Sequence, residues 1–219
     1  MKTKVTDAID ATRIIVVTRG LALDALEKVS QALMDGGLNV IELAFSASDK
    51  AGNLATASCI ASLKSKFGDA LCVGAGTVLD DEQLRLASDC GAGFIVSPNV
   101  DRAIIEKTKE AGLVSIPGAL TPTEIAAAHS FGADYIKLFP AAQMGEQYLK
   151  TITAPLNHLR LIPFGGITLE NYKRFLINGA YGAGIGDSLV NDRYVGTGNY
   201  AIITNTAKQY ARLTSECIK

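Results

Sequence analysis

Short apolar segments alternate along the chain with longer segments whose apolar positions recur at helical spacing. The apolar segments are rich in β-branched residues and begin roughly 20 to 30 residues apart, as expected of minimal strand–helix units. Eight of them occur, at residues 13–19, 40–45, 71–77, 94–98, 114–118, 135–140, 160–166 and 182–188. Helical patterns lie between them, for example at Leu23–Asp35, Asp80–Asp89, Asp101–Ala111 and Leu169–Asn178. The pattern therefore predicts a strand-then-helix unit repeated eight times.

Boundary residues support this division. The run Thr121-Pro122-Thr123-Glu124 is typical of a helix start, with an N-cap threonine, proline at the first helical position and an acid at the third. Glycine is the residue that most often terminates a helix, because it adopts the left-handed conformation without strain. Glycines follow five of the helical patterns, at Gly36, Gly91, Gly112, Gly132 and Gly179.

Eight strand–helix units in 219 residues predict an α/β protein with a compact (β/α)₈ TIM barrel, as a single domain over residues 1–219. A doubly wound open sheet is the alternative, but no G-x-G-x-x-G turn follows the first strand. The segment before Arg13 is predicted to be an additional helix that closes the N-terminal end of the barrel. Active sites of such barrels lie at the C-terminal ends of the strands, so we look for functional residues there.

Composition narrows the possible functions. The 21 basic and 22 acidic residues give a net charge of −1, so no basic excess is present to neutralise a nucleic-acid backbone. No apolar run approaches the roughly 20 residues that span a bilayer, and the N-terminus is too polar for a signal peptide. Neither of the two histidines, His129 and His158, lies close in sequence to another good metal ligand, and the four cysteines lack metal-binding spacing. We expect a cytoplasmic protein with no metal, no cofactor, and neither a nucleic-acid nor a membrane partner.

Two charged residues interrupt apolar strands. Lys137 lies within Tyr-Ile-Lys-Leu-Phe and Glu42 within Val-Ile-Glu-Leu-Ala-Phe. A lysine on the inward face of a barrel has a lowered pKa and yields a neutral amine, which can form a Schiff base with a carbonyl substrate. Glu42 can then transfer protons as a general acid and base. The alternative is a structural ion pair between the two residues or a lysine that reaches the rim.

Other residues near the strand ends suggest an anionic substrate. Arg19 ends the first strand and can hold a carboxylate or phosphate with two hydrogen bonds, or be an ordinary rim arginine. Paired glycines follow the seventh strand at Gly165 and Gly166, and Gly186 follows the eighth. In many (β/α)₈ enzymes these two loops bind phosphate, although glycines also serve tight turns. Asp187 conflicts with this interpretation, because a carboxylate repels phosphate.

Several motifs in order give the chain a resemblance to a known family. They are Glu42, Gly74-Ala75-Gly76-Thr77, Ser97-Pro98-Asn99, Pro117-Gly118, Lys137-Leu138-Phe139-Pro140 and Gly165-Gly166-Ile167. The chain thus resembles the 2-keto-3-deoxy-6-phosphogluconate aldolases, a class I aldolase family with 4-hydroxy-2-oxoglutarate and phosphogalactonate variants. The resemblance runs from about Arg13 to Val190 and so covers nearly the whole predicted barrel.

The resemblance implies roles for individual residues. Lys137 matches the Schiff-base lysine and Glu42 the proton-transferring glutamate. Residues that match the pyruvate end of the site, with the strand-one arginine of many members, are Arg19, Thr77, Pro98 and Phe139. Residues that match the phosphate site are Gly165, Gly166, Gly186 and Ser188. The implied reaction, of the Entner–Doudoroff type, cleaves a 2-keto-3-deoxy sugar acid, expected as its 6-phosphate, to pyruvate and glyceraldehyde 3-phosphate in a homotrimeric enzyme.

Two departures from the family bear on the substrate. Ser46 stands where some members carry a carboxylate-binding arginine, and Phe164 stands where threonine or valine is usual. A phenylalanine there removes a hydroxyl and fills volume beside the substrate, so we include Phe164 among the substrate-binding residues. Two alternatives to the aldolase stay open: a phosphate-binding (β/α)₈ isomerase or synthase without a covalent intermediate, and a non-catalytic sugar-acid-phosphate binding protein.

Overall fold

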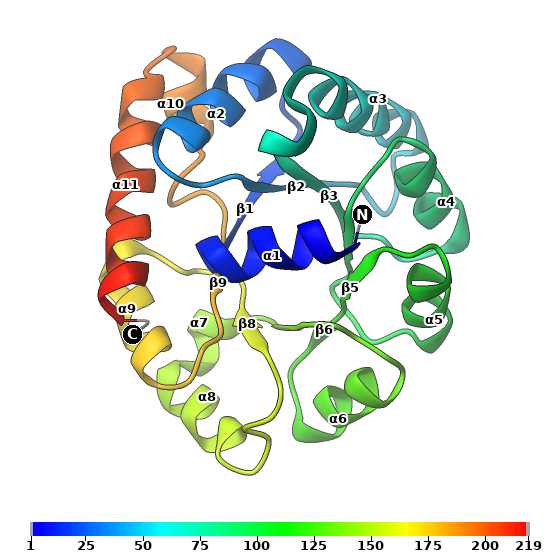
Figure 1. Ribbon diagram of the computed structural model, residues 1–219, viewed down its shortest axis with the longest axis vertical. Helices are drawn as coiled ribbons and strands as arrows, with labels where there is room; N and C mark the ends of the chain where they lie inside the picture. Colours follow the sequence, from blue (N-terminus) through cyan, green and yellow to red (C-terminus); the bar gives the residue numbers. More distant parts are fainter. Residues whose placement is uncertain (1, 218–219) are drawn as a thin grey trace.

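The computed structural model describes residues 2–217 and contains parallel β-strands surrounded by helices (Figure 1). The strands are β1 (Ile14–Arg19), β2 (Val40–Ala44), β3 (Cys72–Gly76), β4 (Phe94–Val96), β5 (Val114–Ile116), β6 (Gly118–Ala119), β7 (Ile136–Leu138), β8 (Leu161–Pro163) and β9 (Ala183–Ile185). Each of the eight predicted strand segments contains a strand. The fifth is divided into β5 and β6 at Pro117, whose nitrogen has no hydrogen to donate to a ladder.

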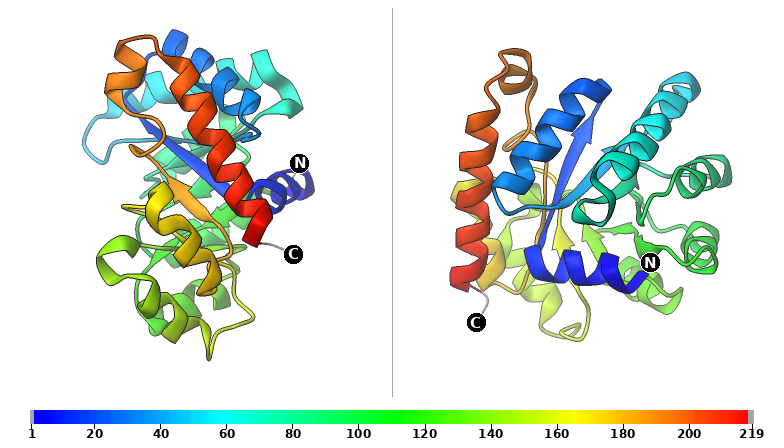
Figure 2. Two further views of the ribbon diagram at one scale, coloured as in Figure 1. Left: turned by 90° about the vertical axis from the view of Figure 1, so that its left-hand side faces the viewer. Right: turned by 45° about the horizontal axis from the view of Figure 1, so that its top comes forward.

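Helices follow the strands and surround the sheet. They are α1 (Lys2–Thr12), α2 (Leu23–Asp35), α3 (Lys50–Phe67), η1 (Gly68–Ala70), α4 (Asp81–Asp89), α5 (Arg102–Glu110), α6 (Pro122–Ser130), α7 (Ala141–Met144), α8 (Glu146–Thr153), α9 (Leu169–Ile177), α10 (Asp192–Gly196) and α11 (Tyr200–Cys217). The predicted capping box at Thr121 and Glu124 is confirmed. Figure 2 shows α11 running along the side of the molecule, where it packs against α2 and α9.

The strands form a curled parallel sheet in two hydrogen-bonded parts. The larger part has the order β5-β4-β3-β2-β1-β9, and the smaller part the order β6-β7-β8. The two parts meet twice. At one junction β5 continues into β6 through a single residue. At the other, a parallel bridge joins Phe164 to Gly184. The loops that follow the strands therefore gather at one end of the curled sheet.

Alternation along the strands separates two apolar clusters. The inner cluster consists of residues on the concave face, with part of α1: Val5, Ile9, Ile15, Val40, Phe94, Val96, Val114, Ile116, Tyr135, Ile162 and Phe164. Outward neighbours such as Ile41 and Leu43 pack instead with helical residues in the larger cluster. Since Val40 and Tyr135 face inward, Glu42 and Lys137, two residues further along, share that face.

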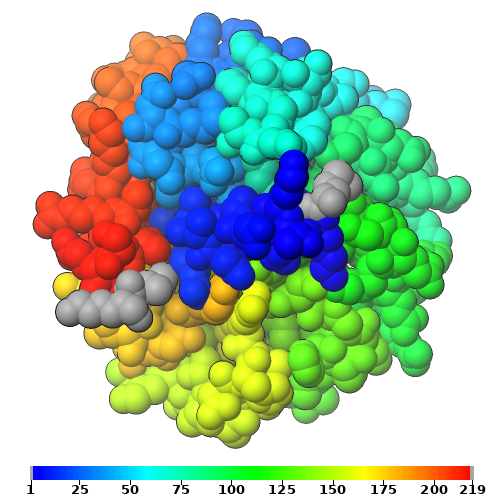
Figure 3. Space-filling view, viewed as in Figure 1, coloured from blue at the N-terminus to red at the C-terminus, as the bar shows by residue number. Residues whose placement is uncertain are grey.

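Helix α1 lies across the end of the curled sheet opposite the gathered loops, where its atoms cover the centre of the face in Figure 3. Its two buried apolar side chains, Val5 and Ile9, join the inner cluster. Asp10 accepts hydrogen bonds from the hydroxyls of Tyr135, at 2.6 Å, and Tyr181, at 2.7 Å. The segment before Arg13 thus forms a helix over the N-terminal ends of the strands and leaves the end with the gathered loops uncovered.

Candidate active site

Glu42 and Lys137 both lie inside the curled sheet, where the charge of each acts on the other. Glu42 is 2% exposed and is the third residue of β2, while Lys137 is the middle residue of the short strand β7. Their charges interact, and Arg19 at the end of β1 interacts with both. The structure therefore brings together three charged residues that lie more than 20 residues apart along the chain.

Burial perturbs both ionisations in the direction of the neutral forms. It lowers the pKa of Lys137, an effect that the negative charge of Glu42 opposes and the positive charge of Arg19 reinforces. Burial likewise raises the pKa of Glu42, against the opposing effects of Lys137 and Arg19. A buried amine with a lowered pKa is a better nucleophile at neutral pH than an ordinary lysine.

The carboxylate of Glu42 is buried, yet one of its oxygen atoms has no hydrogen bond within residues 2–217. Its Oε2 atom is fully buried and has no hydrogen-bond partner among residues 2–217. Its Oε1 atom lies so close to the Cα of Gly76 that a Cβ there would overlap it. A buried polar atom with no partner is unusual and is a feature of catalytic groups. The free Oε2 atom is therefore available to accept or deliver a proton.

Two phenylalanine rings surround the amine of Lys137. Its Nζ atom lies 4.9 Å from the ring centroid of Phe139 and 4.7 Å from that of Phe164. Phe164 is buried, and a Cβ at Gly184 would overlap its ring, so glycine there makes room for it. The faces of aromatic rings stabilise a nearby cation. Phe139 and Phe164, both predicted at the substrate site, thus lie beside the Lys137 amine.

Arg19 and Thr77 form one edge of the site. The Arg19 guanidinium donates hydrogen bonds to the Phe45 carbonyl oxygen, at 3.0 Å, and to Oγ1 of Thr77, at 3.2 Å. Thr77 has a φ of 58°, a left-handed conformation that is strained for a β-branched residue. Strain of this kind gathers at functional sites, where surrounding contacts maintain it. Arg19 is thereby fixed beside Glu42 while its side chain stays exposed.

Pro98, predicted at the pyruvate end of the site, lies one strand away from Lys137. It follows β4 and is partly buried, and its backbone lies directly against Gly118. Gly118 is in turn the register partner of Lys137 in the adjacent strand. A side chain at Gly118 would overlap the Pro98 carbonyl, so this glycine allows the backbone at the end of β4 to approach the strand of Lys137.

The two loops after β8 and β9, which carry the residues predicted to bind phosphate, lie side by side. Gly165 and Gly166 have positive φ angles of 88° and 75°. The Ser188 hydroxyl donates to the Ile167 carbonyl oxygen at 2.7 Å and so ties the loops together. Within residues 2–217, six amide N–H groups of these loops have no protein acceptor: those of Gly165, Gly166, Ile167, Gly186, Asp187 and Ser188. Gly186 supplies the turn into the second loop.

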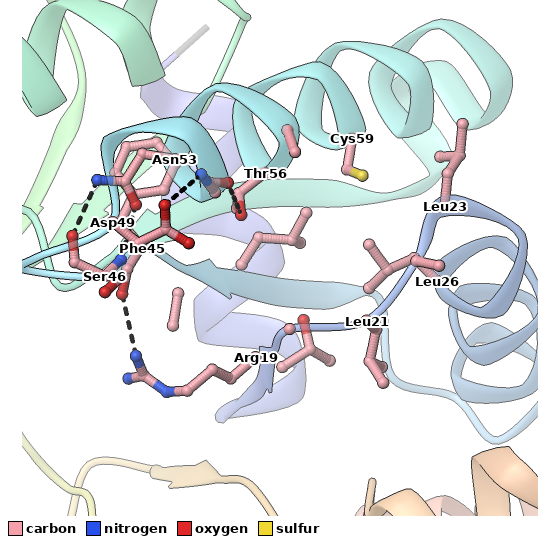
Figure 4. A pocket seen from close by; sticks show the side chains of 17 residues that line it. Arg19, Leu21, Leu23, Leu26, Phe45, Ser46, Asp49, Asn53, Thr56 and Cys59 are labelled. Carbon is pink, nitrogen blue, oxygen red and sulfur yellow. Dashed lines mark hydrogen bonds between the residues drawn. The ribbon is translucent and has the colours of Figure 1, made fainter.

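A separate cleft of about 510 Å³ lies between α2 and α3 (Figure 4). Arg19 and Ser46 line its rim, and Leu26 and Cys59 line its interior. Ser46, the position of the first family departure, is engaged with Asn53 through hydrogen bonds of 2.7 and 2.9 Å. Neither Lys137 nor Glu42 lines this cleft, whereas Arg19 lines it and also interacts with the charges of both residues.

The sequence did not single out Gly76 or Gly184 as site residues. Both matter because a side chain at either position would displace Glu42 or Phe164. Alternation could have indicated Gly76, since it lies in the strand that pairs with the strand of Glu42. Over residues 2–217, the side chains offer no cluster of three or more metal-ligating groups, and no helix is long and apolar enough to cross a membrane.

Comparisons with known proteins agree with this arrangement. A family model described as "KDPG and KHG aldolase" matches residues 5–206. A probable 2-dehydro-3-deoxy-6-phosphogalactonate aldolase of Rhizobium meliloti is 35% identical over 80% of this chain and 81% of its own. A 2-dehydro-3-deoxy-phosphogluconate aldolase of Treponema pallidum is 31% identical over 93% of this chain and 94% of its own.

Solved structures show the same likeness. KDPG aldolase from Legionella pneumophila, with pyruvate captured as a covalent carbinolamine, superposes with a TM-score of 0.84 at 26% identity. The match covers 95% of this chain and 98% of that one. A native KDPGal structure gives a TM-score of 0.82 at 28% identity, over 94% of this chain and 95% of that one. The relatives are named as aldolases, which are carbon–carbon lyases, and this chain belongs to the KDPG and KHG aldolase family.

Proposed function

We propose that this protein is a class I aldolase that reversibly cleaves a 2-keto-3-deoxy sugar acid to pyruvate and an aldehyde. The observation that carries the proposal is the buried amine of Lys137 within the electrostatic influence of Glu42. The named relatives act on 2-dehydro-3-deoxy-phosphogluconate or 2-dehydro-3-deoxy-6-phosphogalactonate, which supports this substrate class. The carbinolamine in the Legionella relative supports a covalent intermediate.

In the proposed reaction, the neutral amine of Lys137 attacks C2 of the substrate and gives a carbinolamine. Glu42 in its acid form delivers a proton to the C2 oxygen, which leaves as water, so that an iminium forms. Its carboxylate then takes the proton of the C4 hydroxyl as the C3–C4 bond breaks, which releases the aldehyde and leaves an enamine. Protonation at C3 and hydrolysis of the iminium release pyruvate and restore the amine.

Side chains around the pair have complementary tasks in this proposal. The rings of Phe139 and Phe164 stabilise the positive iminium that replaces the neutral amine. Arg19, hydrogen-bonded to Thr77, holds the substrate carboxylate at the pyruvate end, and Pro98 lines the same end. The loop amides near Gly165, Gly166, Gly186 and Ser188 bind the far end of the substrate.

The finer architecture belongs to the same proposal. We take the curled sheet to close into a complete (β/α)₈ barrel in one domain, supported by the continuity of β5 with β6 and by the Phe164–Gly184 bridge. The homotrimer and the cytoplasmic location, which rest on the family resemblance and the composition, stay predictions. Sedimentation equilibrium of the purified chain tests the trimer.

Reduction with borohydride in the presence of pyruvate tests the mechanism. We expect a stable adduct on the peptide that contains Lys137 and on no other lysine peptide. Lys137→Met should abolish the adduct, while Lys173→Met, which removes a lysine from helix α9, should not. A wild-type enzyme that cleaves keto acids without forming the adduct would favour an isomerase-like or synthase-like site without a covalent intermediate. Ligand binding by Lys137→Ala, with no turnover by wild type, would favour a binding protein.

A further inference from the structure

The loops at the far end of the site offer no positive side chain to a phosphate. We call the segments 164–168 and 186–191 the distal loops, because they adjoin each other beyond Lys137. Their sequences are Phe-Gly-Gly-Ile-Thr and Gly-Asp-Ser-Leu-Val-Asn, without lysine, arginine or histidine. Phosphate carries nearly two negative charges at neutral pH, and these loops would offer it only uncharged donors, chiefly their amide N–H groups.

The hydroxyl expected at the phosphate is already engaged. Oγ of Ser188 donates its one hydrogen to the Ile167 carbonyl oxygen at 2.7 Å and lies 3.2 Å from the Tyr210 hydroxyl of α11. Since a serine hydroxyl has a single hydrogen, none remains for a substrate oxygen. Ser188 therefore fixes the distal loops to each other and to α11.

Asp187 adds a negative charge to this end of the site. Its side chain is exposed and forms no ion pair with any residue in the described range 2–217. Its own N–H is one of the amides without an acceptor. An aspartate side chain is short, so the carboxylate stays within roughly 4 Å of that nitrogen whatever its rotamer. An anion bound there would lie close to a like charge that has no ion-pair partner within residues 2–217.

We propose that the distal loops bind the uncharged, hydroxyl-bearing end of an unphosphorylated 2-keto-3-deoxy sugar acid, and that Asp187 selects against a phosphate. The carboxylate accepts hydrogen bonds from substrate hydroxyls, and the amides at Gly165 and Gly166 donate to hydroxyl oxygens. This inference rests on the proposed aldolase function. It replaces the phosphorylated substrate expected from the sequence.

The test uses aldol addition of pyruvate to glyceraldehyde and to glyceraldehyde 3-phosphate, which differ in the phosphate alone. Wild type should have the higher kcat/KM with glyceraldehyde. Asp187→Asn should raise kcat/KM for glyceraldehyde 3-phosphate at least about tenfold, because a like charge is removed, and change that for glyceraldehyde much less. Asp192→Asn, at the start of α10, removes a nearby acid outside the distal loops and should leave the ratio unchanged.

Two results would overturn the inference: a wild-type preference for the phosphorylated aldehyde, or an unchanged ratio in Asp187→Asn. Borohydride trapping of pyruvate in the same preparations separates this failure from failure of the proposed function. An adduct on Lys137 with a preference for phosphate refutes the role of Asp187 and leaves the aldolase intact. The absence of any adduct refutes the aldolase, and the inference with it.

Discussion

Gly76 lies against Glu42 so closely that a Cβ at residue 76 would overlap Oε1 of the carboxylate. The two residues belong to neighbouring strands, and the free Oε2 atom of Glu42 depends on the room that this glycine leaves. Gly76→Ala should therefore displace the carboxylate and lower kcat about a hundredfold or more, the scale of a general acid–base contribution.

Steady-state kinetics of Gly76→Ala check this expectation. Gly196→Ala is the matched control, because a Cβ at this α10 position meets no atom within 4 Å. It should leave kcat unchanged. Unaltered kcat in a folded Gly76→Ala enzyme would show that the position of the Glu42 carboxylate does not govern turnover.

The pH dependence of Schiff-base formation should reflect the neighbours of Lys137. Attack requires the neutral amine, so the rate rises with pH through a lysine pKa that burial places below the ordinary 10.5. The Glu42 charge raises this pKa and the Arg19 charge lowers it. Glu42→Gln should therefore move the rising limb to lower pH, and Arg19→Met should move it to higher pH. Trapping rates with pyruvate and borohydride across pH measure both shifts, and shifts of the opposite sign would contradict this electrostatic assignment.

The buried charges should reduce the stability of the fold. The lowered pKa of Lys137 means that the unfolded chain holds this proton more tightly, so stability increases as pH rises through the interval between that pKa and 10.5. Glu42 has a raised pKa, so its ionisation costs stability as pH rises above the ordinary value of 4.5. The double variant Glu42→Gln, Lys137→Met should be more stable than wild type at neutral pH, by about 1–4 kcal/mol.

Urea unfolding of the double variant and of both single variants measures this effect. Each single variant leaves one buried charge without its partner, so we expect the double variant to exceed the sum of the two single changes. A double variant less stable than wild type would mean that the pair stabilises the fold as a structural ion pair.

Phe164 should influence both specificity and stability. Its ring is 4.7 Å from the Lys137 amine and packs over Gly184. Phe164→Thr should increase use of gluconate-type keto acids relative to wild type, because it opens volume beside the reacting carbon. It should also cost on the order of 3 kcal/mol of unfolding free energy, because the ring is buried. Cleavage rates with gluconate-type and galactonate-type substrates give the ratio, and an unchanged ratio would remove Phe164 from the specificity determinants.

Sequence periodicity was sufficient to locate the strands because strands and helices have different apolar repeats. It placed each of the eight strand segments and the helix before Arg13, and it identified Lys137 and Glu42 as charges within apolar strands. The division of the fifth segment at Pro117 was missed, although a proline without an N–H explains it. The match of motifs to the aldolase family is confirmed by the family model over residues 5–206.

The sequence by itself determined the order of strand–helix units and the residue types that can form a Schiff base, because both follow from local periodicity and side-chain chemistry. Only the tertiary structure decided which groups remain free to act. The approach of Gly76 to Glu42 leaves the carboxylate room, and the Ser188–Ile167 hydrogen bond uses the hydroxyl that a phosphate would need. Such contacts join segments distant along the chain, and their geometry depends on how the strands curl around a shared interior.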